Sequence, residues 1–140
     1  MKVEELMTRD PATLRPDSTC SEAAVLMKRE DCGSLPVVKD GRLVGIVTDR
    51  DIVVRGVAGG KDPTHLAVSE VMTSGPITIA PGMNAEEASK LMSEKQVRRL
   101  PVVDGGRLVG ILAIGQLARH ESANVAGETL KEVSQPAAKR

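Results

Sequence analysis

Apolar residues recur along this chain in two patterns, one typical of helices and one typical of buried strands. Three apolar residues at helical spacing follow Thr19, a good N-cap, which predicts a helix that begins there. The segments 35–38 and 42–47 are short, apolar and rich in β-branched residues, and Asp40-Gly41 between them is a tight-turn sequence. The pattern therefore predicts a helix followed by a β-hairpin.

The whole pattern occurs twice. Shifting the sequence by 65 positions aligns Val3–Arg55 with Val68–His120 without a gap, and Gly41–Ile46 repeats residue for residue as Gly106–Ile111. Each copy predicts a short helical turn, a brief strand (12–14 or 77–79), a helix capped by Thr19 or Asn84, a hairpin and a last helix.

This order predicts an α+β fold of two β-α-β-β-α repeats, each with a small three-stranded mixed sheet. We expect repeat 1 over residues 1–58, a linker over 59–66 and repeat 2 over 67–121. Residues 122–140 are expected to form a short C-terminal helix, with Ala126, Leu130 and Val133 at helical spacing, and a tail. A single repeat is barely large enough to bury a stable core of its own, so the two repeats are expected to pack together.

The composition of the chain argues against several classes of function. Nineteen basic and nineteen acidic residues cancel, and the chain has no Phe, Tyr or Trp on which bases could stack, so nucleic-acid binding is disfavoured. No apolar run is long enough for a membrane span or a signal peptide, which favours a cytoplasmic location.

Cys20 and Cys32, at opposite ends of one helix, are expected to be free thiols. Neither a metal site, a required cofactor nor a catalytic motif is expected, so the chain is not predicted to be an enzyme.

One stretch, Gly45–Asp51, combines a strand-to-helix turn with a hydroxyl and a carboxylate. The first N–H groups of a helix lack intrahelical partners and attract anions, so Thr48 and Asp51 are candidates for holding a phosphate and a sugar. The alternative is a helix cap, because Thr-x-x-Asp is close to a capping box. In repeat 2 the same turn has Ala113 and Gln116, which indicates that the fold does not require the hydroxyl and the carboxylate.

With both copies in view, the chain resembles the CBS-domain family, and the tandem unit resembles a CBS pair, or Bateman module. The resemblance rests on Gly-hydrophobic-x-Thr-x-x-Asp at Gly45–Asp51, on Leu35-Pro36-Val37-Val38 and on Pro76-Ile77-Thr78, and it covers Val3 to His120. It implies two repeats related by a pseudo-two-fold axis, adenosine-ligand clefts between paired sheets, and a homodimer formed through helices.

Carried onto this chain, the resemblance implies that Thr48 contacts phosphate and Asp51 holds the ribose. Arg50 is positioned to add a charge-assisted phosphate contact. The resemblance also implies that the segments before the first two strands line the adenine. The residues concerned are Pro11, Thr13, Gly33, Ser34, Leu35 and Pro36.

Repeat 2 departs from this pattern, so one competent and one degenerate cleft are expected. Gln116 can hydrogen-bond but is not an ionised acceptor for two ribose hydroxyls. Arg98 and Arg99 either meet a phosphate or form a solvated helix end. The possible second phosphate site therefore comprises Thr78, Arg98, Arg99, Pro101 and Gln116.

The leading hypothesis is a regulatory module that binds AMP, ADP or ATP mainly through Thr48 and Asp51. The alternative is a ligand-independent, homodimeric protein-interaction module with an unknown protein partner.

Overall fold

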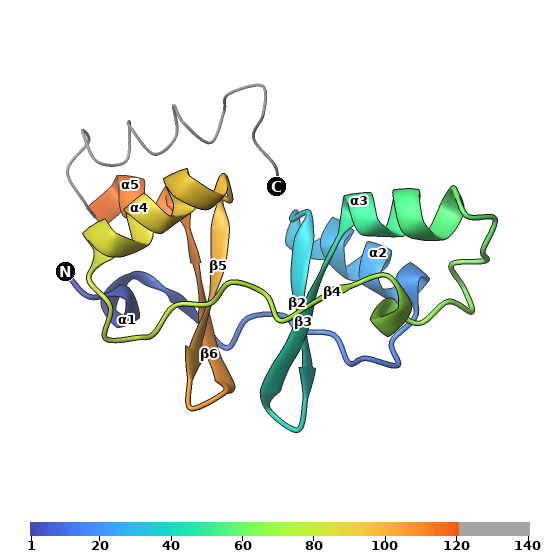
Figure 1. The fold of residues 1–140 in the computed structure, drawn as a ribbon, viewed down its shortest axis with the longest axis horizontal. Coiled ribbons are helices and arrows are strands. Elements are labelled where there is room, and N and C mark those ends of the chain that lie inside the picture. The colour runs from blue at the N-terminus through green and yellow to red at the C-terminus, as the bar shows by residue number, and fades with distance from the viewer. Residues whose placement is uncertain (121–140) are drawn as a thin grey trace. The chain divides into compact units, whose positions relative to one another are not determined.

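A computed structural model describes residues 1–120, and the helix expected near Ala126 lies outside them. The chain forms two compact units, one of Met1–Pro11 with Ile77 onward and the other of Ala12–Pro76. We call them the C-terminal unit and the central unit. Figure 1 shows the β-hairpin and the helices of each. The first eleven residues thus belong to the unit built mainly from repeat 2.

The central unit contains α2 (Cys20–Glu30), β2 (Ser34–Lys39), β3 (Arg42–Thr48), α3 (Asp49–Asp51), η1 (Ile52–Val57), η2 (Val68–Glu70) and β4 (Thr73–Ser74). β3 pairs antiparallel with β2 on one side and with β4 on the other. The hairpin turn places Asp40 at φ 53° and Gly41 at φ 79°, the conformation expected for a two-residue type I′ turn.

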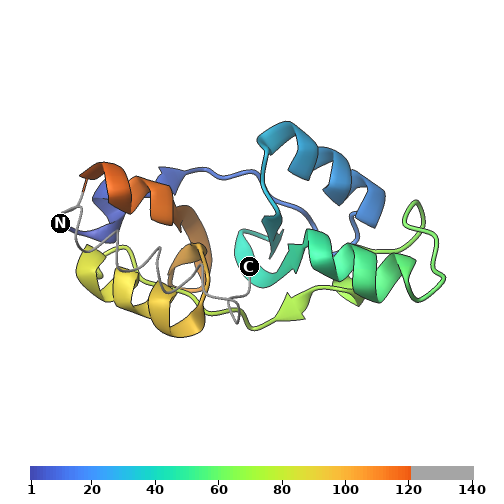
Figure 2. The same cartoon turned by 90° about the horizontal axis from the view of Figure 1, so that it is seen from above.

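The C-terminal unit repeats this arrangement with α1 (Val3–Leu6), β1 (Thr8–Arg9), α4 (Ala85–Lys95), β5 (Arg99–Asp104), β6 (Arg107–Ala113) and α5 (Ile114–His120). β6 pairs with β5 and with β1, so the short strand of this sheet comes from the N-terminus. Figures 1 and 2 show α4 and α5 side by side at one end of the β5–β6 hairpin.

The brief strands expected at 12–14 and 77–79 are reduced to single parallel bridges. Leu14 bridges Val37, and Ile79 bridges Val102. The Leu14 N–H donates to the Pro36 carbonyl at 3.0 Å, and the Val38 N–H donates to the Leu14 carbonyl at 2.8 Å. The expected mixed sheet is present, but its parallel strand is one residue long.

Both helices start at the predicted N-caps. The Glu22 N–H donates to Thr19 Oγ1 at 3.1 Å, and the Glu86 N–H donates to Asn84 Oδ1 at 2.8 Å. Asp31 and Gln96 then end α2 and α4 in the left-handed conformation, with φ of 51° and 54°. These matched ends fix the point at which each β-hairpin begins.

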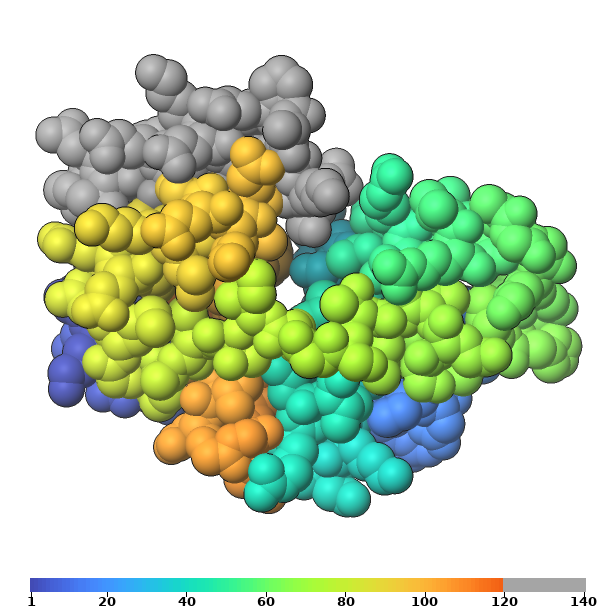
Figure 3. Space-filling model, viewed as in Figure 1, coloured from blue at the N-terminus to red at the C-terminus, as the bar shows by residue number. Residues whose placement is uncertain are grey.

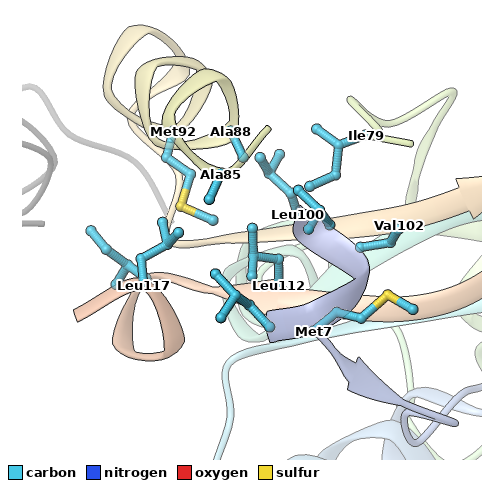
Figure 4. Close-up of a cluster of buried hydrophobic side chains, with 12 residues drawn as sticks. Met7, Ile79, Ala85, Ala88, Met92, Leu100, Val102, Leu112 and Leu117 are labelled. Atoms are coloured by element: carbon cyan, nitrogen blue, oxygen red, sulfur yellow. The ribbon is translucent and has the colours of Figure 1, made fainter. Parts of the chain in front are cut away.

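Each unit has its own apolar core. In the C-terminal unit Met92, Leu100, Leu112 and Leu117 are fully buried between α4, α5 and the hairpin, as Figure 4 shows. The central unit buries Cys20, Ala23, Val37, Val47 and Val71 in the same way. Both cysteines are free thiols, as expected, and Cys20 is buried.

Candidate nucleotide site

The turn Thr48–Asp51 forms a complete, reciprocal capping box. The Asp51 N–H donates to Thr48 Oγ1 at 3.0 Å, and the Thr48 N–H donates to Asp51 Oδ2 at 3.0 Å. The helix-cap interpretation is therefore correct for these two residues. It orients both side chains in fixed directions, which is also what a binding site requires.

The backbone amides of this turn do not form the anion site that the sequence predicted. The Asp49 N–H donates to the Gly33 carbonyl at 2.9 Å, and the Arg50 N–H donates to Asp49 Oδ1 at 2.8 Å. The Asp51 N–H is engaged by Thr48, and the Ile52 N–H reaches the Asp49 carbonyl. All four N–H groups that would attract an anion already have acceptors, so a phosphate would have to be held by side chains.

Capping leaves hydrogen-bonding capacity on both side chains. A hydroxyl that accepts one bond still has its own proton to donate, and a carboxylate that accepts one bond still has lone pairs on both oxygens. Thr48 can therefore donate to a phosphate oxygen, and Asp51 can accept from ribose hydroxyls. The Asp51 side chain is 14% exposed, so it is shielded but reachable.

The central unit brings most of the predicted nucleotide residues together. Ser34 lies opposite Thr48 in the β2–β3 ladder, and Gly33 is bonded to Asp49. Thr13 is exposed just before Leu14, which is hydrogen-bonded to Pro36.

Other predicted residues contribute differently from the prediction. Leu35 and Pro36 are buried, so their side chains serve the core and only their backbone is left for a ligand. The Arg50 side chain is exposed. Pro11 belongs to the C-terminal unit, not to the unit that holds Thr48.

Two neighbours of the site were missed by sequence reasoning. The Asp49 carboxylate lies against Gly33, where an added Cβ would stand 3.1 Å from Asp49 Oδ2. Arg55 Nε lies 3.8 Å from Asp51 Oδ1. The four-residue spacing of Asp51 and Arg55 on a helix was the available signal.

In the C-terminal unit the equivalent turn keeps half of the capping box. The Ala113 N–H donates to Gln116 Oε1 at 2.7 Å. The turn forms without the hydroxyl and the carboxylate, as the sequence comparison indicated, but Gln116 still supplies one cap hydrogen bond. Gln116 Nε2 in turn donates to Thr8 Oγ1 at 2.7 Å. Both polar ends of Gln116 are thus engaged within the unit.

The remaining residues of the possible second phosphate site lie around the start of β5. Arg98 and Arg99 are exposed, and the Arg98 carbonyl accepts from the Ile114 N–H at 2.9 Å. Thr78 is exposed, while Pro101 is buried and its carbonyl accepts from the Ile79 N–H at 3.0 Å.

Two comparable turns, one with Thr and Asp and one without, thus end two copies of the same hairpin. A family model described as CBS domain matches residues 3–56 and 68–123, which together are more than half of the chain. The chain belongs to the CBS domain family.

The CBS relatives include small proteins of the same size. The CBS domain-containing protein YhcV of Bacillus subtilis (strain 168) is 46% identical over 133 residues, which cover 94% of each chain. Hypoxic response protein 1 of Mycobacterium tuberculosis (strain ATCC 25618 / H37Rv) is 33% identical over 135 residues, or 96% of this chain and 94% of that protein.

Solved CBS structures share the fold. The crystal structure of Hypoxic Response Protein I with two coordinated zinc ions matches with a TM-score of 0.80 at 34% identity, covering 87% of this chain and 100% of that one. CBSX2 in complex with AMP matches with a TM-score of 0.74 at 29% identity, covering 93% and 98%.

Over residues 1–120, no three His, Cys, Asp or Glu side chains gather closely enough to hold a metal ion. No helix there is both long and apolar enough to span a bilayer.

A groove of about 520 Å³ is present in the central unit, and no residue of the Thr48–Asp51 turn lines it. It is lined by the 13–15 segment, Ser18 and one face of α2, and it shares only Thr13 with the predicted site. We attach the candidate site to the turn, because neither Thr48 nor Asp51 lines the groove.

Proposed function

We propose that this CBS pair is a regulatory module that binds an adenine nucleotide, AMP, ADP or ATP, through the central unit. The Thr48 hydroxyl donates to a phosphate, Asp51 accepts from the ribose hydroxyls, and Arg50 reaches a further phosphate oxygen. The Gly33–Pro36 backbone and Thr13 line the adenine.

The observation that carries this proposal is the difference between the two capped turns. Thr48 and Asp51 keep donor and acceptor capacity after capping, whereas Ala113 has no hydroxyl and Gln116 has no ionised carboxylate to accept from two ribose hydroxyls. The AMP named in the CBSX2 complex supports an adenosine ligand. Because a ligand stabilises the arrangement that it contacts best, binding would act as a regulatory signal and needs no catalysis.

Nucleotide binding can be tested directly on the purified chain. The protein has no Trp or Tyr, so a co-purified nucleotide would dominate its ultraviolet absorbance. Calorimetric titration of the nucleotide-free chain with AMP, ADP and ATP is expected to give binding heat, and adenosine is expected to bind more weakly because it lacks the phosphate. Absence of heat with every nucleotide at millimolar concentration would reject the proposal.

A homodimer is the second part of the proposal, and exposed valines support it. Val53, Val54 and Val57 on η1 are 57%, 50% and 53% exposed, and this segment lies at the surface in Figure 3. The aligned positions of Val53 and Val54 in repeat 2 are Ala118 and Arg119, so these two valines are not repeated there. A homodimer with this segment at its two-fold axis would remove the valines from water.

Light scattering on a matched pair of variants tests this contact. Val53→Glu is expected to shift the mass toward that of a monomer, because it buries a charge in the interface, whereas Ala118→Glu on the aligned position of α5 is expected to leave the dimer intact. A monomeric wild-type chain at high protein concentration, or equal masses for both variants, would contradict this contact. A dimer without nucleotide affinity would favour the ligand-independent interaction module.

A further inference from the structure

Arg55 links the nucleotide turn to a distant part of the central unit. Its Nε lies 3.8 Å from Asp51 Oδ1, and its Nη1 donates to the Val71 carbonyl at 3.1 Å. Val71 is 1% exposed, so the carbonyl belongs to a residue anchored in the core. The planar guanidinium is thereby held at one end while another of its edges faces the carboxylate.

The Asp51 carboxylate therefore has a protein group on each oxygen. Oδ2 accepts the Thr48 N–H, and Oδ1 faces the Arg55 guanidinium. The backbone bond sets the direction of the Asp51 side chain, and the charge that faces the second oxygen further favours one orientation of the carboxylate. Because the 3.8 Å separation is longer than a hydrogen bond, Oδ1 keeps lone pairs for a ligand hydroxyl.

The C-terminal unit shows what happens where the carboxylate is missing. Gln116 stands at the position of Asp51, and its second polar end is fixed by Thr8 from β1. Its neighbour four residues on is His120, where the central unit has Arg55. A neutral amide is oriented by a hydroxyl in one unit, and a charged carboxylate is oriented by an arginine in the other.

We propose that Arg55 is a positioning residue for the nucleotide site: it orients the Asp51 carboxylate and ties it to the core segment that ends at Val71. Its effect on affinity rests on the proposed nucleotide binding, whereas its effect on Asp51 exists in the free protein. Arg55 thus acts through Asp51 and differs from Arg50, whose exposed side chain is placed to meet the phosphate itself.

Amide hydrogen exchange by NMR tests the positioning role without any nucleotide. Removing the guanidinium in Arg55→Ala is expected to loosen the Asp51 carboxylate and to speed exchange of the Thr48 N–H several-fold, while the Ala113 N–H stays unchanged as an internal control. Arg55→Lys is expected to restore part of the protection through its charge. Arg50→Ala removes a basic residue from the same turn and is expected to leave the exchange rate of the Thr48 N–H unchanged. Unchanged Thr48 exchange in Arg55→Ala would overturn the inference.

A double-mutant cycle on AMP affinity tests the consequence for binding. Arg55→Ala is expected to weaken AMP binding about tenfold in the wild-type background and to add little in the Asp51→Asn background, because the arginine acts through the carboxylate. Equal losses in both backgrounds would show that Arg55 acts independently of Asp51 and would overturn the inference. If the wild-type chain bound no nucleotide, the proposed function would fail, but the exchange experiment would still decide the role of Arg55.

Discussion

At the scale of single residues, the same helix start is built in two ways. Thr48 and Asp51 satisfy each other's N–H groups, while Gln116 alone satisfies the N–H of Ala113. The change from Asp to Gln removes a charge, and the change from Thr to Ala removes a donor. The difference between the two turns is therefore chemical, because the hairpins that carry them have the same register.

A second feature at the scale of single residues is the low pKa of Asp62. Hydrogen bonds from the Thr64 hydroxyl at 2.7 Å and the Thr64 N–H at 2.9 Å, together with His65, lower the pKa of Asp62 to about 2. The folded-state pKa lies below the ordinary value of about 3.9. The ionised Asp62 therefore stabilises the folded chain fully at a pH above about 3.9, and this stabilisation is lost as the pH falls toward about 2.

A carboxyl-detected NMR titration checks this value. Thr64→Ala is expected to raise the pKa of Asp62 toward the ordinary range, and Thr64→Ser, which keeps the hydroxyl, is expected to leave it low. An ordinary pKa for Asp62 in the wild-type chain would show that these hydrogen bonds do not form in solution.

At the scale of elements, Gly45 and Gly110 allow the short strands β4 and β1 to approach and pair with β3 and β6. A Cβ on Gly45 would stand 2.5 Å from Met72 Sδ and 2.9 Å from the Thr73 carbonyl oxygen. The same holds for Gly110, at 2.6 Å from Met7 Sδ and 2.8 Å from the Thr8 carbonyl oxygen. The backbone of β4 or β1 occupies the space that a side chain would need.

Gly45→Ala is therefore expected to destabilise the chain by about 1–3 kcal/mol, since the methionine can move but the carbonyl belongs to a paired strand. Urea denaturation measures the change. Gly82→Ala, where an added Cβ meets nothing within 4 Å, is the control and is expected to be nearly neutral. Equal stabilities for Gly45→Ala and the wild-type chain would mean that β4 is not held at this distance.

The elements themselves were largely predictable, because capping residues, turn dipeptides and apolar periodicity are local signals. Thr19, Asn84 and the two hairpin turns behave as predicted. The pairing of Thr8 with Ile111 left no local signal, since a two-residue strand has no periodicity and its partner lies far along the chain. For the same reason the contact of Arg55 with the Val71 carbonyl was not predicted.

At the scale of the whole molecule, the compact units cross the boundary between the sequence repeats. The N-terminal segment Met1–Pro11 joins the unit of repeat 2, and the segment that ends at Pro76 joins the unit of repeat 1. Each unit thus takes its shortest strand from the other repeat. Neither sheet is therefore complete without a strand from the neighbouring repeat.

Of the two similar turns, we propose that only the one with Thr48 and Asp51 binds the nucleotide. Calorimetric titration of the wild-type chain, Asp51→Ala and Gln116→Ala with AMP tests it most directly, with circular dichroism to confirm that each variant is folded. We expect one AMP per chain for the wild type and for Gln116→Ala, and no measurable binding for folded Asp51→Ala. Unchanged binding in Asp51→Ala, or loss of binding in Gln116→Ala alone, would contradict it.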